Sequence, residues 1–332
     1  MARVSVLMPM KNTARYVRDA VTSVLSQDFR DVELVVVDDA STDGSRAVVE
    51  SIRDRRIRLL AGQERGVSAA WNVGLAVATG EVLMQCDSDD LYPQGRIARQ
   101  LRFLDAHPEF GAVCGPFSTM TPSGRNVADL WADGDQAEEI TQELLGGHTR
   151  THLCAFAIRT EHLRALGGKR EYFESAEDLD LQLRLAERCR IWYEPYGAYR
   201  YRLHDASVTH TQPSSRRQFF EQYARDLRRQ RATGKPDDLQ RGEPLDPPEA
   251  PSPPDRSGEQ LRGMLIGEAW RQHRRGDRLA AIVNGLRALA HSPTTFEIWK
   301  SVAALLFKPS SGATSGSVER ARRRRDPPVT SP

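Results

Sequence analysis

Cysteine is scarce in this chain, and a charge excess and long apolar runs are missing. The four cysteines, at positions 86, 114, 154 and 189, lie far apart without metal-site spacing, which favours isolated reduced thiols over a disulfide framework. No apolar run reaches the roughly 18 residues of a membrane-spanning helix. The 47 basic and 45 acidic residues leave a net charge of +2, which gives no indication of a nucleic-acid partner. The N-terminus enters a strand pattern without signal-peptide features, so we expect a cytoplasmic protein.

The composition changes along the chain and divides it into four parts. Residues 1–232 mix strand and helix patterns, and we expect one large α/β domain there. Residues 233–258 hold seven prolines and several acids, which predicts an extended or disordered linker. Residues 259–308 show helical apolar spacing and predict a C-terminal helical appendage. Residues 309–332 are rich in Ser and Gly, then Arg, then Pro, and predict a disordered basic tail.

Strand and helix patterns alternate in the first hundred residues. Runs rich in β-branched residues predict strands, and apolar positions three and four residues apart predict helices. The expected strands are 4–8, 32–37, 57–60 and 82–86, and the expected helices are 14–27, 44–53, 67–78 and 93–107. We expect Pro9 to end the first strand and Thr13 to cap the first helix. This alternation is typical of a mostly parallel central sheet flanked by helices.

The second half of the α/β domain is less regular. The expected strands are 110–114, 153–158, 191–193 and 198–202, with a weaker strand signal before Trp131, and the expected helices are 135–145, 175–188 and 214–231. Leucines alternate in residues 175–188 as they would in a strand. The residues there are nevertheless helix formers and none is β-branched, so we predict a helix buried on two sides and capped by Ser175.

Two acidic clusters follow predicted strands directly. Asp87, Asp89 and Asp90 come after the strand that we place at 82–86, and Asp38 and Asp39 end the strand at 32–37. Open α/β sheets bind their ligands at the carboxyl ends of the strands. Carboxylates so close together repel one another unless a cation lies among them, and oxygen ligands suit Mg²⁺ or Mn²⁺. The sequence therefore favours a metal and phosphate site here over a polar turn that only caps the next helix.

Six motifs occur in order and at a familiar spacing between residues 3 and 210. They are Val4-Ser5-Val6-Leu7-Met8-Pro9-Met10-Lys11-Asn12, Val35-Val36-Val37-Asp38-Asp39-Ala40-Ser41-Thr42-Asp43-Gly44-Ser45, Gly66-Val67-Ser68-Ala69-Ala70-Trp71-Asn72-Val73-Gly74, Asp87-Ser88-Asp89-Asp90, Glu177-Asp178 and Tyr201-Arg202-Leu203-His204-Asp205-Ala206-Ser207. Together they resemble glycosyltransferase family 2, the inverting nucleotide-sugar transferases of GT-A fold. Each motif alone is weak, but six in order are specific.

The resemblance implies roles for the donor-binding residues. Asp38 or Asp39 would contact the nucleotide base, and we favour Asp39. Pro9 and Asn12 would line the base pocket, largely through their backbone. Asn72 belongs to the same donor site.

The resemblance also implies the catalytic groups. Asp89 would bind Mn²⁺ or Mg²⁺ directly, and Asp87 would lie close to the metal or the ribose. His204 would lie near the metal or the phosphates on a loop that closes over the diphosphate. Asp178 would act as general base on the acceptor hydroxyl. Each of these side chains also has a structural reading, because acids cap helices and a lone histidine is usually an ordinary surface residue.

One position departs from the family pattern. Trp71 stands just before Asn72, where the family usually has Arg. The usual cationic contact to the donor is then either missing or supplied by Arg65.

We therefore expect a metal-dependent, inverting hexosyltransferase that moves a sugar from a nucleotide-diphosphate sugar, preferably a UDP-sugar, to a hydroxyl of a surface glycan, glycolipid or small metabolite. A nucleotidyltransferase is disfavoured because residues 8–13 lack a Gly-rich basic phosphate loop. The alternative from another class is a non-catalytic nucleotide- or sugar-binding subunit that recruits a partner through its C-terminal helices. Those helices could also form a homodimer, or touch the cytoplasmic face of a membrane together with the arginines at 322–325.

Overall fold

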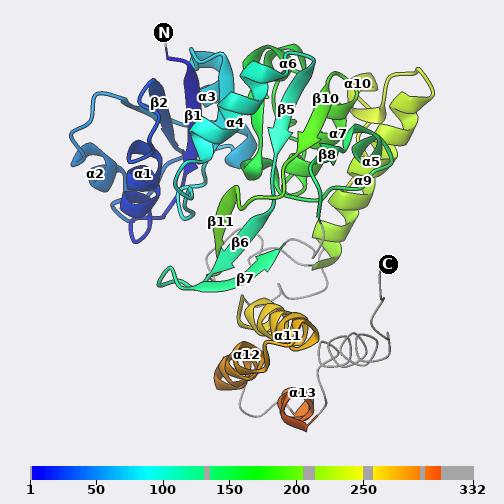
Figure 1. Cartoon of the computed structure of the whole chain (residues 1–332). Coiled ribbons are helices and arrows are strands. Elements are labelled where there is room, and N and C mark those ends of the chain that lie inside the picture. Colours follow the sequence, from blue (N-terminus) through cyan, green and yellow to red (C-terminus); the bar gives the residue numbers. More distant parts are fainter. Residues whose placement is uncertain (1, 131–134, 205–213, 250–256, 292–295, 308–332) are drawn as a thin grey trace, which may run out of the picture. The chain divides into compact units, whose positions relative to one another are not determined.

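The computed structural model describes residues 2–130, 135–204, 214–249, 257–291 and 296–307 (Figure 1). The chain forms two compact units, Met1–Pro254 and Asp255–Pro332. No helix in these described ranges is both long enough and apolar enough to cross a membrane. Residues 205–213 and the predicted basic tail at 309–332 lie outside the described residues.

A mixed sheet forms the centre of the first unit. Eight of the described strands lie in it, in the order β3-β2-β1-β4-β9-β5-β10-β8. Their bounds are β1 Val4–Met10, β2 Val32–Asp38, β3 Ile57–Ala61, β4 Val82–Gln85, β5 Phe110–Cys114, β8 Glu138–Glu139, β9 Ala157–Arg159 and β10 Arg190–Tyr193. Strands β3, β2, β1 and β4 are parallel, and β9 runs antiparallel between β4 and β5. The expectation of a mostly parallel central sheet is confirmed.

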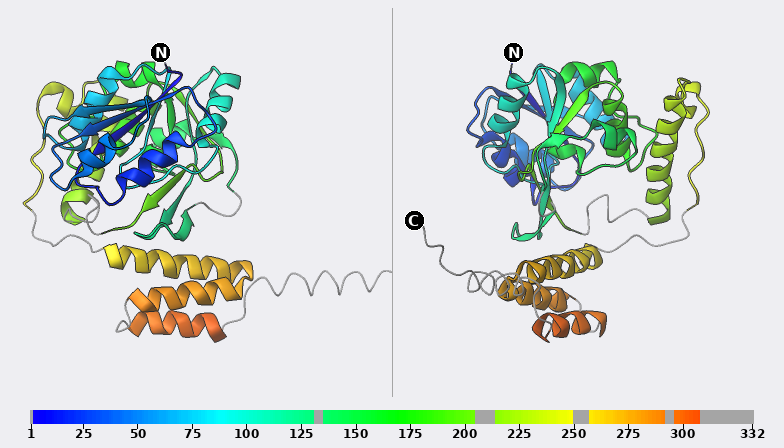
Figure 2. Two further views of the ribbon diagram at one scale, coloured as in Figure 1. Left: turned by 90° about the vertical axis from the view of Figure 1, so that its left-hand side faces the viewer. Right: turned by 45° about the vertical axis from the view of Figure 1, so that its right-hand side comes forward.

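Helices cover both faces of this sheet (Figures 1 and 2). The helices of the first unit are α1 Val17–Leu25, α2 Ser45–Glu50, α3 Val67–Val77, α4 Arg96–Ala106, α5 Thr141–Leu145, α6 Thr160–Ala165, α7 Glu177–Ala186, α9 Ser214–Ala232 and α10 Asp238–Arg241. On one face, α1 and α4 place Val21 and Leu101 in one core with Val6 of β1. On the other face, α3 and α7 place Leu75 and Leu181 in one core with Leu7. The neighbours Val6 and Leu7 thus enter opposite cores, as the alternation of a strand requires.

A second sheet has the order β11-β6-β7, with bounds β6 Phe117–Met120, β7 Asn126–Leu130 and β11 Tyr199–Arg202. The weak strand signal before Trp131 therefore belongs to real strands. An isolated bridge between Leu91 and Arg200 links β11 to the segment that follows β4. Strands from the later part of the chain are in this way brought to the acidic cluster after β4.

The strand and cap predictions are wrong at several places. Pro9 lies inside β1, which runs on to Met10. The pairing of β1 with β4 ends at Leu7, so β4 has no residue opposite Pro9 that would need its missing N–H. Thr13 does not cap α1, and its hydroxyl instead donates to Ser88 Oγ at 3.0 Å. Ser175 does not cap α7, whose N-cap is Ala176 with φ 61°.

Two predicted elements are shorter than expected. The strand expected at 153–158 is divided into a 3₁₀ turn, Leu153–Ala155, and the three-residue strand β9. The helix expected at 135–145 is reduced to α5, because β8 precedes it and pairs with β10. The helix predicted at 175–188 is confirmed as α7. The helix-forming residue types were a better guide here than the strand-like alternation of the leucines.

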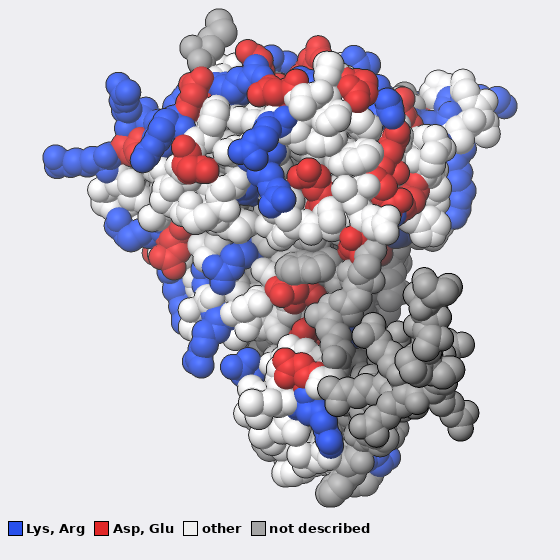
Figure 3. Space-filling view, viewed as in Figure 1, with Lys and Arg blue, Asp and Glu red and all other residues white. Residues whose placement is uncertain are grey.

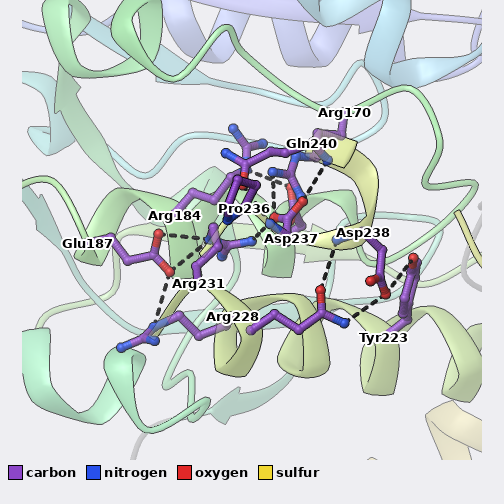
Figure 4. Close-up of polar contacts among 12 residues, drawn as sticks. Arg170, Arg184, Glu187, Tyr223, Arg228, Arg231, Pro236, Asp237, Asp238 and Gln240 are labelled. Carbon is purple, nitrogen blue, oxygen red and sulfur yellow. Dashed lines mark hydrogen bonds and ion pairs between the residues drawn. The ribbon is translucent and has the colours of Figure 1, made fainter. Parts of the chain in front are cut away.

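The first half of the predicted linker is packed rather than extended (Figure 4). Residues 238–241 form α10, and Asp237 caps it through a capping box with Gln240. Asp237 is 0% exposed and its carboxylate pairs with Arg170, at 2.7 Å, and with Arg231 of α9. Asp238 accepts a hydrogen bond from Gln230 of α9 at 2.7 Å. A buried acid between two arginines ties this stretch to the rest of the first unit, which proline content alone could not reveal.

Replacing Asp237 by Ala is expected to lower the free energy of unfolding by about 3 kcal/mol, because it removes the carboxylate that Arg170 and Arg231 share. The loss stays at the low end for a buried pair, since Arg170 keeps Asp180 and Arg231 keeps Glu187. Glu243→Ala is the matched control, since Glu243 is 67% exposed and, among the described residues, pairs with Arg241 alone. That control should cost about 1 kcal/mol or less. Urea denaturation measures both, and equal losses in the two variants would contradict the prediction.

The second unit consists, in its described part, of three helices. They are α11 Ser257–Arg275, α12 Arg278–His291 and α13 Phe296–Phe307. Their small core contains Ala269, Ala281 and Leu305, and Gly285 lets α13 approach closely, since a Cβ there would lie 3.0 Å from Leu305. The predicted helical appendage is present. Its roles in dimer formation or membrane contact stay predictions.

Candidate active site at the carboxyl ends of the parallel strands

The predicted site residues gather where β1, β2, β3 and β4 end. Backbone hydrogen bonds join the segments just past these ends: Asp39 N donates to Met10 O, Gly62 N to Asp38 O and Cys86 N to Leu7 O. The acidic clusters of β2 and β4, far apart in the chain, thereby lie at one edge of the sheet. On the face seen in Figure 3, basic and acidic side chains are interspersed over the surface.

Asp87 lies just past β4 and is held on all sides. One carboxylate oxygen accepts from Gln85 Nε2 at 2.7 Å and the other from Cys154 Sγ at 3.1 Å, while the Tyr199 hydroxyl accepts from its backbone N–H at 2.9 Å. Burial raises the pKa of Asp87 to about 6, and the carboxylates of Asp89 and Asp178 add to the rise. A cation bound among these carboxylates would offset their mutual repulsion and favour the ionised form of Asp87.

Asp89 and His204 meet although 115 positions separate them. His204 Nε2 lies 2.8 Å from Asp89 Oδ2. Strand β11 brings His204 there, because Arg202 donates from Nε to the Asp89 carbonyl and from its backbone N–H to Asp90 Oδ1, both at 2.6 Å. His204 thus lies beside the residue predicted to bind the metal, and its role toward metal or phosphate stays a prediction.

Asp90 has a different role from Asp87 and Asp89. It is buried, and one of its carboxylate oxygens has no hydrogen-bond partner. Burial and the carboxylates of Asp89 and Asp87 raise its pKa. Because its other oxygen accepts the Arg202 backbone N–H, Asp90 joins the turn after β4 to β11 rather than capping α4, whose N-cap is Gly95.

The side chains present fit a divalent cation that shares its ligands with a substrate. Asp89 and Asp87 offer carboxylate oxygens, and His204 offers a ring nitrogen. Burial raises the pKa of Asp87, and the nearby carboxylates of Asp89 and Asp178 raise it further, so negative charge is concentrated here. Within the described ranges, no three His, Cys, Asp or Glu side chains already stand as a complete metal-binding group. Mg²⁺ and Mn²⁺ commonly keep one or two carboxylates and complete their shell with water and substrate phosphates, which this arrangement permits.

The structure gives Asp38 and Asp39 different hydrogen-bond partners, a difference that the sequence could not show. Asp38 uses both oxygens: one accepts from Ser41 N at 3.1 Å and the other lies 3.6 Å from Arg46 Nη1. Asp39 accepts from Gly66 N, at the start of α3, with one oxygen at 3.0 Å, and its other, buried oxygen has no partner. An unpartnered buried acceptor is the group that a ligand donor would satisfy.

Pro9 and Asn12 lie on the β1 side of this edge. Pro9 is buried within β1 and pairs in register with Val37. Asn12 Oδ1 accepts from Thr42 N at 2.8 Å, and its own N–H donates to Ser41 Oγ at 3.0 Å, so it ties the loop after β1 to the loop after β2. This shapes the loops around Asp39.

Strained backbone marks the same edge. Within the described residues, the non-glycine positions with positive φ are Asn12, Ala40, Glu64 and Ala176. The first three follow β1, β2 and β3, and Ala176 immediately precedes the Glu177-Asp178 pair. Such conformations cost about 1–3 kcal/mol each and concentrate at functional sites.

Asp178 and Glu177 begin α7, where the helix dipole favours negative charge. The ammonium of Lys169 lies 2.6 Å from Asp178 Oδ1 and 3.5 Å from Glu177 Oε1. Burial raises the pKa of Glu177 to about 7; Lys169 opposes that rise and Asp178 adds to it. Since Asp178 also raises the pKa of Asp87, the predicted base lies within electrostatic reach of the predicted metal ligands.

Lys169 lies beside Trp71, and the contact of Arg65 to the donor stays a prediction. Trp71 is 1% exposed, and Lys169 Nζ lies 5.6 Å from the centre of its ring. Arg65 pairs with Glu171 and its side chain is 59% exposed. Asn72 has both ends of its amide bonded to the backbone of Lys169, at 2.8 and 2.9 Å. The side chain of Asn72 is thus already in structural use, and its donor contact stays a prediction.

Sequence reasoning missed Lys169, Tyr199 and Arg202 as parts of this site. Arg202 lies inside the motif that contains His204, so the sequence could have predicted that it belongs to the site. Lys169 has only its position after Gly168, which adopts φ +77°. No spacing rule connects it with Asp178.

Comparison with known proteins gives a consistent picture. The family model described as glycosyl transferase family 2 matches residues 5–175. An uncharacterized glycosyltransferase of Nostoc sp. is 38% identical over 114 residues, 33% of this chain and 35% of that protein. One of Rickettsia typhi is 25% identical over 212 residues, 63% of this chain and 66% of that protein. Chondroitin synthase of Pasteurella multocida is 28% identical over 188 residues, 55% of this chain and 19% of that protein.

The aligned regions span less than two thirds of each of these relatives. Among solved structures, S. aureus TarS 1–349 in complex with UDP-GlcNAc has a TM-score of 0.60 at 20% identity, covering 98% of this chain and 92% of that one. The same protein in complex with UDP has a TM-score of 0.55. These likenesses establish the fold.

Proposed function

The chain belongs to glycosyltransferase family 2 and has the GT-A fold, and we propose that it is a glycosyltransferase that moves a sugar from a UDP-sugar to an acceptor hydroxyl with inversion and with the help of Mn²⁺ or Mg²⁺. The observation that carries the proposal is the convergence of Asp87, Asp89, His204 and Asp178 from segments far apart in the chain. The choice of UDP draws on the complexes of S. aureus TarS with UDP-GlcNAc and UDP.

The nucleotide would bind across the ends of β1, β2 and β3. The unpartnered oxygen of Asp39 is a ready acceptor for an N–H of the base. Gly62 faces the same oxygen, and a Cβ there would come within 2.7 Å of it, so only glycine keeps that space open. Pro9 and Asn12 would shape the base pocket, and Asp38 would hold the loop through Ser41.

The diphosphate would lie at the end of β4. Asp89, with Asp87 and His204 beside it, would hold the divalent cation. When bound, that cation supplies positive charge to the leaving diphosphate. Without it, the crowded carboxylates would repel the phosphates.

Asp178 would take the proton of the acceptor hydroxyl. The acceptor oxygen would form its bond to the anomeric carbon as the bond from that carbon to the diphosphate oxygen breaks on the opposite side. A single displacement of this kind inverts the anomeric configuration. The position of Asp178 at the start of α7, on a different element from the metal ligands, suits attack from the far side of the sugar.

The acceptor would approach past a group of aromatic rings near the general base, Asp178. The His152 ring is stacked 5.8 Å from Tyr201 and lies 4.4 Å from the ring of Phe117. Flat rings of this kind give a sugar or lipid-linked acceptor a surface on which to pack. The proposed products are a surface glycan, a glycolipid or a modified small metabolite.

A thermal-shift panel of nucleoside diphosphates and nucleotide sugars, with and without Mn²⁺, tests the proposal. We expect UDP and one UDP-sugar to stabilise the protein in a Mn²⁺-dependent manner, by about 2.7 kcal/mol at 100 times the dissociation constant. Turnover of the stabilising donor is then measured as release of UDP. If no nucleotide shifts the melting temperature, the donor assignment fails and the non-catalytic reading takes its place.

A further inference from the structure

Lys169 is the most deeply buried cation next to the proposed base. Its side chain is 0% exposed, and the ammonium contacts Asp178 at 2.6 Å and Glu177 at 3.5 Å. Burial alone would lower the pKa of this ammonium, but the two carboxylates outweigh burial and raise it. A charge kept so far from water contributes to stability only weakly, so its presence calls for a functional reason.

Several contacts fix the position of Lys169. The amide of Asn72 in α3 bonds both its backbone N–H and its carbonyl. Gly168 comes so close to Asn72 that a Cβ on it would lie 2.3 Å from the amide oxygen. Arg184 of α7 donates to the Gly168 carbonyl at 2.8 Å. The backbone at Lys169 is thus held from α3 and from the same helix that carries Asp178.

The side chain of Lys169 is positioned as tightly as its backbone. Its Nζ lies 5.6 Å from the centre of the Trp71 ring, which belongs to α3 and is itself buried. The indole face gives the ammonium a cation–π partner on one side, and the carboxylates of Asp178 and Glu177 receive it on the other.

We propose that Lys169 is the positioning residue of this active site. Its ammonium packs on Trp71, its backbone is bonded to Asn72, and it holds the Asp178 carboxylate in the orientation that receives the proton of the acceptor. This inference rests on the proposed function, because it assigns Asp178 the role of base. Lys169 acts through Asp178 and not on the donor, since its side chain has no exposed surface with which to touch a bound nucleotide.

Two variants and a control test the assignment. Lys169→Met removes the ammonium and keeps the stem. Trp71→Arg combined with Lys169→Met returns a cation to the same space from α3. Lys235→Met is the control, because Lys235 is exposed. For each protein we measure the melting temperature, the dissociation constant for UDP with Mn²⁺ by calorimetry, and kcat and KM for release of UDP from the donor.

The expected pattern separates catalysis from binding. Lys169→Met should lower kcat about 100-fold, within the range of general-base effects, and leave the UDP dissociation constant within threefold. Its melting temperature should fall by about 5 °C or more, because Asp178 and Glu177 lose their counter-charge. The double variant should regain at least tenfold in kcat and part of the melting temperature, and Lys235→Met should match the wild type.

Three results would overturn the inference: a Lys169→Met variant with kcat within threefold of wild type, a loss of UDP affinity as large as the loss of kcat, or a folded double variant no faster and no more stable than Lys169→Met. If Lys169→Met does not fold, Lys169→Met/Asp178→Asn removes both charges and should fold and bind UDP normally; failure to bind would contradict the assignment. Absence of turnover in the wild type would count against the proposed reaction, while the melting temperatures still decide whether Lys169 is the counter-charge of Asp178.

Discussion

Replacing Asp178 by Asn is expected to lower kcat for sugar transfer by about 10²–10⁴-fold and to leave the affinity for UDP unchanged. The amide has nearly the shape of the carboxylate but cannot take the proton of the acceptor hydroxyl. Asp178 lies at the start of α7 with Lys169 at 2.6 Å, so the variant also removes a charge pair. Transfer is measured as release of UDP in the presence of acceptor, and UDP binding by calorimetry.

The neighbouring acid provides the sharpest comparison for Asp178. Glu177 shares the ammonium of Lys169, and burial raises its pKa to about 7, so it is the rival base next to Asp178. Asp180, in the same turn, is buried and paired with Arg184. Glu177→Gln should keep most of kcat if Asp178 is the base. Asp105→Asn, an exposed site on α4, should behave as wild type. Near-normal kcat in Asp178→Asn would exclude that residue, and a loss confined to Glu177→Gln would move the base by one position.

Replacing Asp89 by Ala is expected to abolish the stabilisation by UDP and Mn²⁺. The variant loses the carboxylate that faces His204 at 2.8 Å and that we propose as the direct metal ligand. At 100 times the wild-type dissociation constant, the lost stabilisation is about 2.7 kcal/mol. Thermal melts with UDP alone, Mn²⁺ alone and both together measure the effect.

The ligand-free melting temperature is the internal control for Asp89→Ala. Asp89 raises the pKa of both Asp87 and Asp90, which shows that its charge opposes theirs. Removing it relieves this repulsion, which offsets the lost contact with His204, so the variant should melt close to wild type without ligand. A variant that keeps the full Mn²⁺-dependent shift would show that another residue holds the metal, with Asp87 the first to test.

Much of the fold could be predicted from local sequence. Val32–Asp38 is rich in β-branched residues and Val82–Gln85 is mostly apolar, so the sequence identifies both as central strands. The structure buries each of them along its whole length. Acids placed directly after those strands had to meet at one sheet edge, since parallel strands share their carboxyl ends. Helix α7 was predictable because leucine, glutamine and arginine favour a helix even where their order imitates a strand.

The tertiary structure alone decided which acids have free oxygens and which cations reach them. Asp38 and Asp39 are adjacent in sequence and equivalent in type, and only the surrounding loops leave one Asp39 oxygen without a partner. Lys169 lies nine positions before Asp178, and only the packing of α3 and α7 brings its ammonium to the carboxylate. Local sequence determines strands and helices because their hydrogen bonds and alternation are short-range, whereas the ionisation and pairing of buried side chains depend on neighbours that the fold supplies from distant parts of the chain.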